Sequence, residues 1–155
     1  MSTDKRFEIR SIGSIRREND KIFLQIDEKI RPALKELDKF THVMVFWWAD
    51  QHDNEESRTT LQTRPPYAEE YLCGVFATRA EYRPNPIEMT VCKIVSIDET
   101  KGIVTVGNID AFDGTNIIDL KAYFPVCDRV RDAKLPEWLE GWPEWMPDNG
   151  IGMEY

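Results

Sequence analysis

The stretch that decides the fold runs from Met89 to Tyr123 and reads MTVCKIVSIDETKGIVTVGNIDAFDGTNIIDLKAY. Glu99–Gly102 predicts a plain hairpin turn, and Asp113-Gly114 is a strong turn signal of its own. Three β-favouring runs lie around these turns, namely Met89–Asp98, Ile103–Asp110 and Asn116–Tyr123. Short strands joined by tight turns predict an antiparallel sheet.

The segment before this stretch, Gly74–Ile87, reads GVFATRAEYRPNPI and joins a short β-favouring run to a proline-locked corner. Each proline fixes its own φ and pushes the preceding residue toward extended backbone, so Arg83 and Asn85 are presented in one geometry. Such rigidity favours polar recognition, because ordering entropy is lost before a ligand arrives. The alternative is a proline-rich turn whose arginines are simply solvated.

The rest of the chain also reads mostly as strand. Asp27–Lys39 has helical spacing, with Pro32 in the first turn and an acidic start. The almost wholly apolar run His42–Trp48 predicts a strand buried on both faces, with polar residues at its mouth. Further strands are expected at Arg6–Ile15, Lys21–Ile26 and Tyr71–Thr78, with an extended loop over Thr59–Tyr67.

Six or seven short strands with no repeating βαβ pattern exclude a doubly wound sheet, and there is no Gly-x-Gly-x-x-Gly loop. Barrel closure would protect the strand edges. The sequence therefore predicts a mainly β protein, a small closed or partly open antiparallel barrel with one or two short helices. We expect the barrel domain to cover residues 1–131, followed by an extended arm.

The arm, residues 132–155, is acidic and holds three of the five tryptophans. One interpretation is a segment that lies across the barrel or a neighbouring subunit and buries its indole rings there. The other is a lid whose aromatic faces cover a ligand. The two roles are compatible.

Composition limits the function classes. The chain has 155 residues and a net charge of −8, which weighs against generic nucleic-acid binding unless basic residues gather locally. It has neither a bilayer-length apolar run nor a signal-peptide pattern, so a cytoplasmic location and no membrane partner are expected. Three widely spaced cysteines, Cys73, Cys92 and Cys127, read as small buried hydrophobes. The acidic and imidazole groups near Asp50 form no metal-ligand pattern, so no metal is expected.

Several motifs resemble the TsaA-like/TrmO family (YaeB-like), whose members are S-adenosylmethionine-dependent methyltransferases that act on N6 of threonylcarbamoyladenosine in tRNA. They are GVFATR at 74–79, RPNPI at 83–87, DGT at 113–115, IDLKAY at 118–123 and the strand FTHVMVFWW at 40–48. The chain resembles a short form that lacks the family's Pro-Arg-Gln loop and large C-terminal domain. Glu88 stands where the family has glycine, and Asn116 where DGTP has proline.

The resemblance implies a β-barrel, S-adenosyl-L-methionine as cofactor, a homodimer and a possible tRNA substrate. It also implies substrate contacts at Arg83 and Asn85. The positions that it aligns with cofactor contacts are Asp50, Gln51, Arg79, Met89, Asp113, Gly114, Thr115 and Asn116.

Two functions stay open at this point. The chain is either a methyltransferase for a modified tRNA adenosine or a smaller acceptor, or a non-catalytic module that binds adenosylmethionine or a nucleotide. No general base stands out, since Asp50, Asp113 and Tyr82 can each be proposed.

Overall fold

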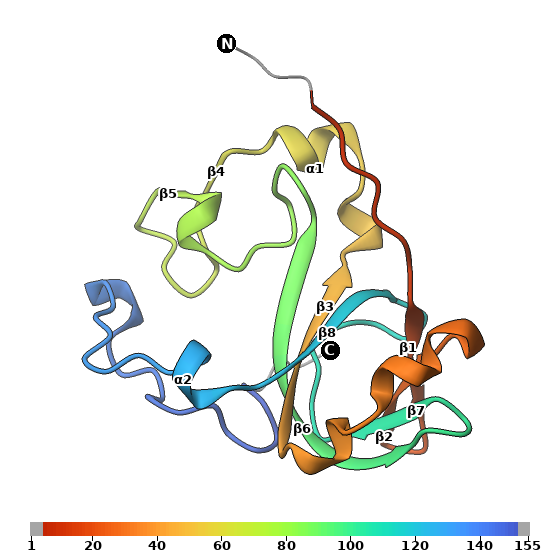
Figure 1. Cartoon of the computed structure of the whole chain (residues 1–155). Helices are drawn as coiled ribbons and strands as arrows, with labels where there is room; N and C mark the ends of the chain where they lie inside the picture. Colours follow the sequence, from red (N-terminus) through yellow and green to blue (C-terminus); the bar gives the residue numbers. More distant parts are fainter. Residues whose placement is uncertain (1–4, 152–155) are drawn as a thin grey trace.

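The computed structural model describes residues 5–151 and forms a closed six-stranded barrel (Figure 1). The strand order is β1-β2-β7-β6-β3-β8, and every neighbouring pair is antiparallel. The predicted fold class is thereby confirmed. The barrel strands are β1 (Gly13–Glu18), β2 (Lys21–Ile26), β3 (His42–Trp48), β6 (Ile87–Asp98), β7 (Ile103–Val106) and β8 (Asn116–Ala122).

Strands β2, β3, β6 and β8 follow the predicted runs closely, and the β6–β7 hairpin turns at the expected place. The Asp98 carboxylate accepts the Lys101 amide N–H at 3.0 Å, and Gly102 has a φ of +69°. The expectation that β3 is buried on both faces is wrong. Its residues alternate between buried and half-buried, because one face lines the barrel interior and the other does not.

Three predicted strands are wrong in extent. The first begins at Gly13 instead of Arg6; Phe7 and Ile9 before it are 80% and 50% exposed and bury no face. Strand β7 ends at Val106. Of the run Tyr71–Thr78, only β5 (Cys73–Gly74) is strand, paired with β4 (Gln62–Thr63) in a separate two-stranded sheet.

The glycine that opens β1 is required by packing. A Cβ at Gly13 would lie 2.1 Å from the carbonyl oxygen of Gln25, because β1 and β2 approach closely there. Any side chain at this position would push the two strands apart, so the close pairing of β1 with β2 requires glycine at position 13.

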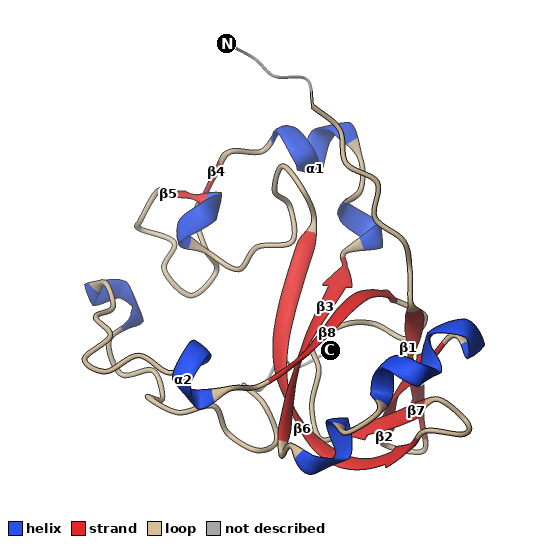
Figure 2. Ribbon diagram, in the orientation of Figure 1, coloured by secondary structure: helices blue, strands red, loops and turns tan. Residues whose placement is uncertain are grey.

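The predicted helix over Asp27–Lys39 is instead two 3-10 helices, η1 (Glu28–Leu34) and η2 (Leu37–Lys39). Glu36 between them has a φ of +70°, and Pro32 inside η1 has no N–H to donate. The remaining helical elements are short (Figure 2). They are η3 (Asp50–His52), α1 (Glu55–Thr59), η4 (Val75–Ala77), α2 (Pro125–Asp128) and η5 (Glu137–Leu139).

The core fills the barrel with branched aliphatic side chains. Its most buried members come from five strands and are Ile15, Leu24, Val43, Val45, Val104 and Ile117. Cys73 and Cys92 are buried as predicted, and burial raises the pKa of the Cys92 thiol, which keeps it unreactive. Cys127 is exposed, so its predicted burial is wrong.

The described part of the arm lies against its own protomer on the side that carries β4 and β5 (Figure 1). Tyr67 stacks on Trp138 at 6.1 Å and meets Trp142 edge-on at 5.1 Å between ring centroids. Lys93 on β6 pairs with Asp148 at 2.7 Å. These contacts agree with an arm that lies across the rest of the chain. The expected burial of its indole rings is wrong for Trp142 and Trp145, which are 41% and 59% exposed. The domain boundary itself stays a prediction.

Residues 5–151 contain neither a membrane-spanning helix nor a cluster of metal-binding side chains. No helix there is long and apolar enough to cross a membrane. No group of three or more His, Cys, Asp or Glu side chains in the same range is arranged to hold a metal ion.

Candidate functional site

A pocket of about 180 Å³, here called the polar pocket, opens where β3 ends. Its lining comes from β3, η3, the loop before β6 and the loop between β7 and β8. Five of the eight predicted cofactor residues take part. The lining residues are Trp47, Ala49, Asp50, Gln51, Glu81, Phe112, Asp113, Gly114 and Thr115.

The Asp113-Gly114 turn is held against β1 by main-chain hydrogen bonds. Gly114 N–H donates to the carbonyl of Ile15 at 2.7 Å, and Ile15 N–H donates to the carbonyl of Thr115 at 2.9 Å. The Asp113 carboxylate accepts the amide N–H of Arg17 at 2.8 Å. Gly114 has a φ of +82°, a conformation that favours glycine, and no atom lies within 4 Å of where its Cβ would be. The turn is therefore rigid and open toward the pocket.

Asp50 approaches the start of β8, although Asn116 itself does not line the pocket. The side-chain amide nitrogen of Asn116 lies 3.5 Å from the Asp50 carboxylate. The Oδ1 atom of Asn116 accepts a hydrogen bond from the Ser11 hydroxyl at 3.0 Å. Asp50 is exposed at the first position of η3, directly after β3. The Asp50 carboxylate thus lies between the end of β3 and the start of β8.

The proline-locked corner is held by arginine side chains that donate to its backbone. Arg83 donates to the carbonyls of Ala80 and Thr78 at 3.1 and 3.4 Å, and its side chain is only 15% exposed. Asn85 accepts a hydrogen bond from Arg58 at 3.0 Å, and Arg58 also donates to the Pro84 carbonyl. Arg83 and Asn85 therefore shape the loop that borders the pocket.

Besides Asn116, two predicted cofactor residues lie outside the pocket lining. Met89 on β6 pairs with Phe46 and points to the outer face, because Glu88 and Thr90 on either side are the inward residues. Arg79 is exposed on the loop after η4, and its charge acts on Glu88. The segment Gly74–Ile87 and the Asp113-Gly114 turn do meet at the pocket. The first contributes Glu81 to the lining and not the predicted Arg79.

Sequence reasoning missed two carboxylates beside the pocket. Burial raises the pKa of Glu81, and burial raises the pKa of Glu88 from an ordinary value near 4.5 to about 8. Glu88 is 7% exposed, and its Oε1 has no hydrogen-bond partner; the Arg83 guanidinium is 3.7 Å away, too far for a hydrogen bond. The available signal was the carboxylate at 88, which interrupts an apolar strand where the family has glycine.

A hydrogen-bonded chain runs behind Glu88 in the barrel interior. Trp47 donates its indole N–H to the Thr90 hydroxyl at 3.1 Å, and that hydroxyl donates to Asp110 at 2.6 Å. Asp110 also raises the pKa of Glu81 and Glu88 through its charge. The pocket end of the barrel is thus polar and acidic, unlike the rest of the core.

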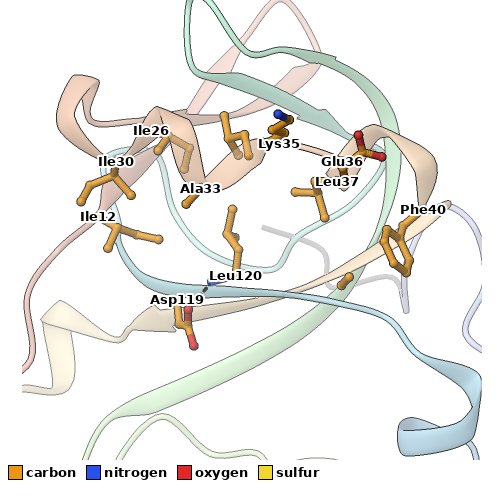
Figure 3. A pocket seen from close by; sticks show the side chains of 12 residues that line it. Ile12, Ile26, Ile30, Ala33, Lys35, Glu36, Leu37, Phe40, Asp119 and Leu120 are labelled. Carbon is orange, nitrogen blue, oxygen red and sulfur yellow. Dashed lines mark hydrogen bonds between the residues drawn. The ribbon is translucent and has the colours of Figure 1, made fainter.

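A second cavity of about 300 Å³, here called the apolar cavity, lies under η1 and η2 (Figure 3). Its walls include Ile26 from β2, Leu34 from η1, Phe40 and, on β8, Leu120. None of the predicted site residues lines it. Its polar groups are few, and Lys35, Glu36 and Asp119 supply their side chains at its edge.

This fold and this pocket define a small β-barrel domain with an acidic pocket at one end, distinct from the doubly wound sheets that bind nucleotides. The chain belongs to the family described as the tRNA-methyltransferase O N-terminal domain, which matches residues 6–129. The resemblance drawn from the motifs is thereby confirmed.

The relatives include binding proteins and an enzyme. A probable S-adenosyl-L-methionine-binding protein of Archaeoglobus fulgidus is 35% identical over 118 residues, covering 76% of this chain and 30% of that protein. The tRNA (adenine(37)-N6)-methyltransferase of Escherichia coli is 30% identical over 127 residues, which cover 80% of this chain and 53% of that enzyme. The chain spans less than two thirds of the length of these relatives.

The fold is also similar to a solved structure. A crystal structure of TrmO matches with a TM-score of 0.66 and 28% identity, covering 84% of this chain and 64% of that one.

Proposed function

We propose that this chain is an S-adenosylmethionine-dependent methyltransferase that methylates the exocyclic N6 of an adenosine in tRNA. The observation that carries the proposal is the gathering of Asp50, Gln51 and the Asp113–Thr115 turn around one pocket. These residues stand at positions that the family resemblance assigns to cofactor contact. The Escherichia coli relative, a tRNA (adenine(37)-N6)-methyltransferase, supports an adenosine in tRNA as the methyl acceptor. The family resemblance implies that this adenosine carries a threonylcarbamoyl group.

The chemistry of the pocket fits adenosylmethionine. Carboxylates at Asp50 and Asp113 accept hydrogen bonds from ribose hydroxyls and attract an ammonium or sulfonium cation. Phe112, 46% exposed, offers an aromatic face to the flat base and to the cation. Gly114 leaves room for a ligand to approach the backbone. When bound, adenosylmethionine supplies a methyl carbon attached to a positively charged sulfur, which needs no strong acid catalyst.

The residues of the chain hold and orient the methyl donor and the acceptor nitrogen, so that the two meet in line and water is excluded. The turn at Asp113–Thr115 is fixed by β1, and the corner at Arg83–Pro86 is fixed by guanidinium donors. Both are set before a ligand binds, which lowers the entropy lost on binding.

Calorimetry and a methyl-transfer assay test this function. Wild-type protein is expected to bind adenosylhomocysteine and to transfer labelled methyl groups to tRNA that lacks the N6 methyl. Asp50→Asn should weaken adenosylhomocysteine binding by about tenfold, since a charge-assisted hydrogen bond contributes about 1.5–3 kcal/mol. Glu99→Gln, in the exposed β6–β7 turn, is the control. Tight binding without transfer to tRNA would favour the binding module instead.

We also propose a homodimer, which the family resemblance implies. The polar pocket, about 180 Å³, is smaller than the roughly 300–1,000 Å³ of ordinary small-molecule sites, so a second copy could complete it. Phe76 and Leu72 beside the corner are 81% and 57% exposed, which supports an uncovered contact surface. Removal of residues 132–155 is expected to weaken self-association, and unchanged sedimentation at low micromolar concentration would reject that role of the arm.

A further inference from the structure

A carboxylate, an imidazole and a hydroxyl form a continuous chain that leads out of the polar pocket. Glu81 lines the pocket, and its Oε2 lies 3.1 Å from Nε2 of His52. Nδ1 of His52 lies 3.2 Å from the hydroxyl of Ser57. The hydrogen-bond network assigns the proton positions, with Ser57 donating to Nδ1 and Nε2–H donating to Glu81.

The three residues come from separate segments, and Ser57 and His52 are each anchored. Ser57 lies in α1, where its amide N–H donates to the Asn54 side chain at 2.8 Å. His52 ends η3, and its amide N–H donates to the Ala49 carbonyl at 2.9 Å. The His52 ring meets the Tyr82 ring edge-on at 5.9 Å between centroids. The Glu81 carboxylate is therefore positioned from outside the pocket.

The surroundings of Glu81 make it a better base than an ordinary carboxylate. Its side chain is 30% exposed, and burial is the main reason why its pKa is raised. Asp110, on the loop after β7, raises that pKa further, while His52 on η3 lowers it. Glu88 on β6 is its acidic neighbour, and Arg83 and Arg79 act on Glu88. A carboxyl with a raised pKa binds a proton more strongly near neutral pH.

The other candidate bases are less suited by their contacts. The Asp113 carboxylate is engaged by the Arg17 main-chain N–H at 2.8 Å. The Tyr82 hydroxyl is bonded to the Thr63 hydroxyl at 2.8 Å, and Tyr82 does not line the pocket. Asp50 is exposed to solvent and faces Asn116. Among the acids lining the pocket, Glu81 alone combines partial burial with an imidazole partner.

We propose that Glu81 is the proton acceptor of the methyl-transfer reaction and that His52, held by Ser57, is its positioning residue. This assignment rests on the proposed function. The acceptor nitrogen forms a bond to the methyl carbon as the carbon–sulfur bond breaks, and that electron pair stays on sulfur. The proton of the nitrogen passes to the Glu81 carboxylate, so that charge and atoms balance without any other reactant.

Glu81→Gln tests the assignment, because glutamine keeps the shape and cannot accept the proton. The kcat for methyl transfer to tRNA is expected to fall by about 10²–10³-fold, within the range of general-base effects. The affinity for adenosylhomocysteine should change by less than about threefold. Glu81→Asp is expected to restore part of the rate. Glu69→Gln, at an exposed position away from the pocket, is the matched control.

A second measurement is independent of turnover. Carbon-detected NMR of the protein alone should show the Glu81 carboxyl titrating above the ordinary value of 4.5. The ring signals of His52 should shift in Glu81→Gln and not in Glu69→Gln. A carboxyl that titrates at or below the ordinary value would overturn the assignment.

The outcomes separate the two proposals. If the wild-type protein methylates tRNA and Glu81→Gln does so equally fast, Glu81 is not the proton acceptor and the proposed function stands. If the wild-type protein binds adenosylhomocysteine and transfers no methyl group to tRNA, both proposals fall.

Discussion

The apolar cavity and the polar pocket differ in size and in chemistry, and the smaller of the two holds the acidic groups. The apolar cavity under η1 and η2, about 300 Å³, is the larger and is lined by aliphatic side chains. The polar pocket, about 180 Å³, contains three carboxylates and borders a buried acid whose pKa is about 8. Perturbed acids near a cleft indicate chemistry better than volume does.

The cavities also differ in how the chain builds them. Much of the lining of the apolar cavity comes from one local stretch, Ile30–Phe40, packed on β2 and β8. The polar pocket takes its lining from positions 47–51, 81 and 112–115, which barrel closure brings to one end. A cavity of the first kind reflects imperfect packing of two short helices, whereas the second is assembled by the fold.

The largest expected effect concerns the acid beside the polar pocket. Glu88 keeps its proton in the folded state up to a pH of about 8, while the unfolded chain loses it near 4.5. Between these values the unfolded state binds fewer protons, so stability falls as the pH rises through this window and is level above it. Relative to Glu88→Gln, the wild-type protein should lose on the order of 5 kcal/mol across the window.

Urea unfolding from pH 4 to pH 9 measures this difference. Glu99→Gln, with an exposed carboxyl, should follow the wild-type profile. A wild-type curve that stays parallel to that of Glu88→Gln would mean that Glu88 is ionised in the fold and paired with Arg83, and that the polar end holds no unusual acid.

The next effect tests the apolar cavity. Leu34 is 2% exposed and lines it, so Leu34→Ala enlarges the cavity. The free energy of unfolding should drop by about 3 kcal/mol, typical of a buried leucine. Adenosylhomocysteine affinity, measured on the folded variant by calorimetry, should be unchanged.

Leu61→Ala is the matched control, because Leu61 is 62% exposed and its truncation should cost less than about 0.5 kcal/mol. A clear loss of ligand affinity in Leu34→Ala would show that the apolar cavity takes part in binding, and the contrast between the two cavities would fail.

The sequence predicts the barrel well where the signal is local. The hairpin at Glu99–Gly102 and the strand at His42–Trp48 each carry their own local pattern, and both elements are confirmed, although the strand is not buried on both faces. The strand expected at Tyr71–Thr78 is wrong, because β-favouring residues there have only the short β4 to pair with and turn into η4. Local preference cannot report which partner strand is available.

The same limit holds for the site. Asp113-Gly114 is visible as a turn, and the family motifs point to Asp50 and Gln51, all of which line the pocket. Glu81 could not be found that way, since its partner His52 is 29 positions away and only the closed fold brings the two side chains together. The roles of these residues stay predictions until they are measured.

The smallest expected effect uses two glycines in the same backbone conformation. Gly114 and Gly141 have φ values of +82° and +87°, and neither has an atom within 4 Å of its Cβ position. Substitution of either by alanine should therefore cost a similar amount of stability, about 1 kcal/mol, because both side chains would occupy left-handed backbone. Only Gly114 lines the polar pocket.

Calorimetry on the two variants isolates what the added methyl group does to the ligand. Gly114→Ala is expected to weaken adenosylhomocysteine binding by about tenfold, or about 1.4 kcal/mol, because the new Cβ occupies space next to the turn that a ligand would contact. Gly141→Ala lies in the arm and should bind as the wild type does. Equal affinities in both variants would place the ligand away from the Asp113–Thr115 turn, and this result would contradict the proposal that the polar pocket is the binding site.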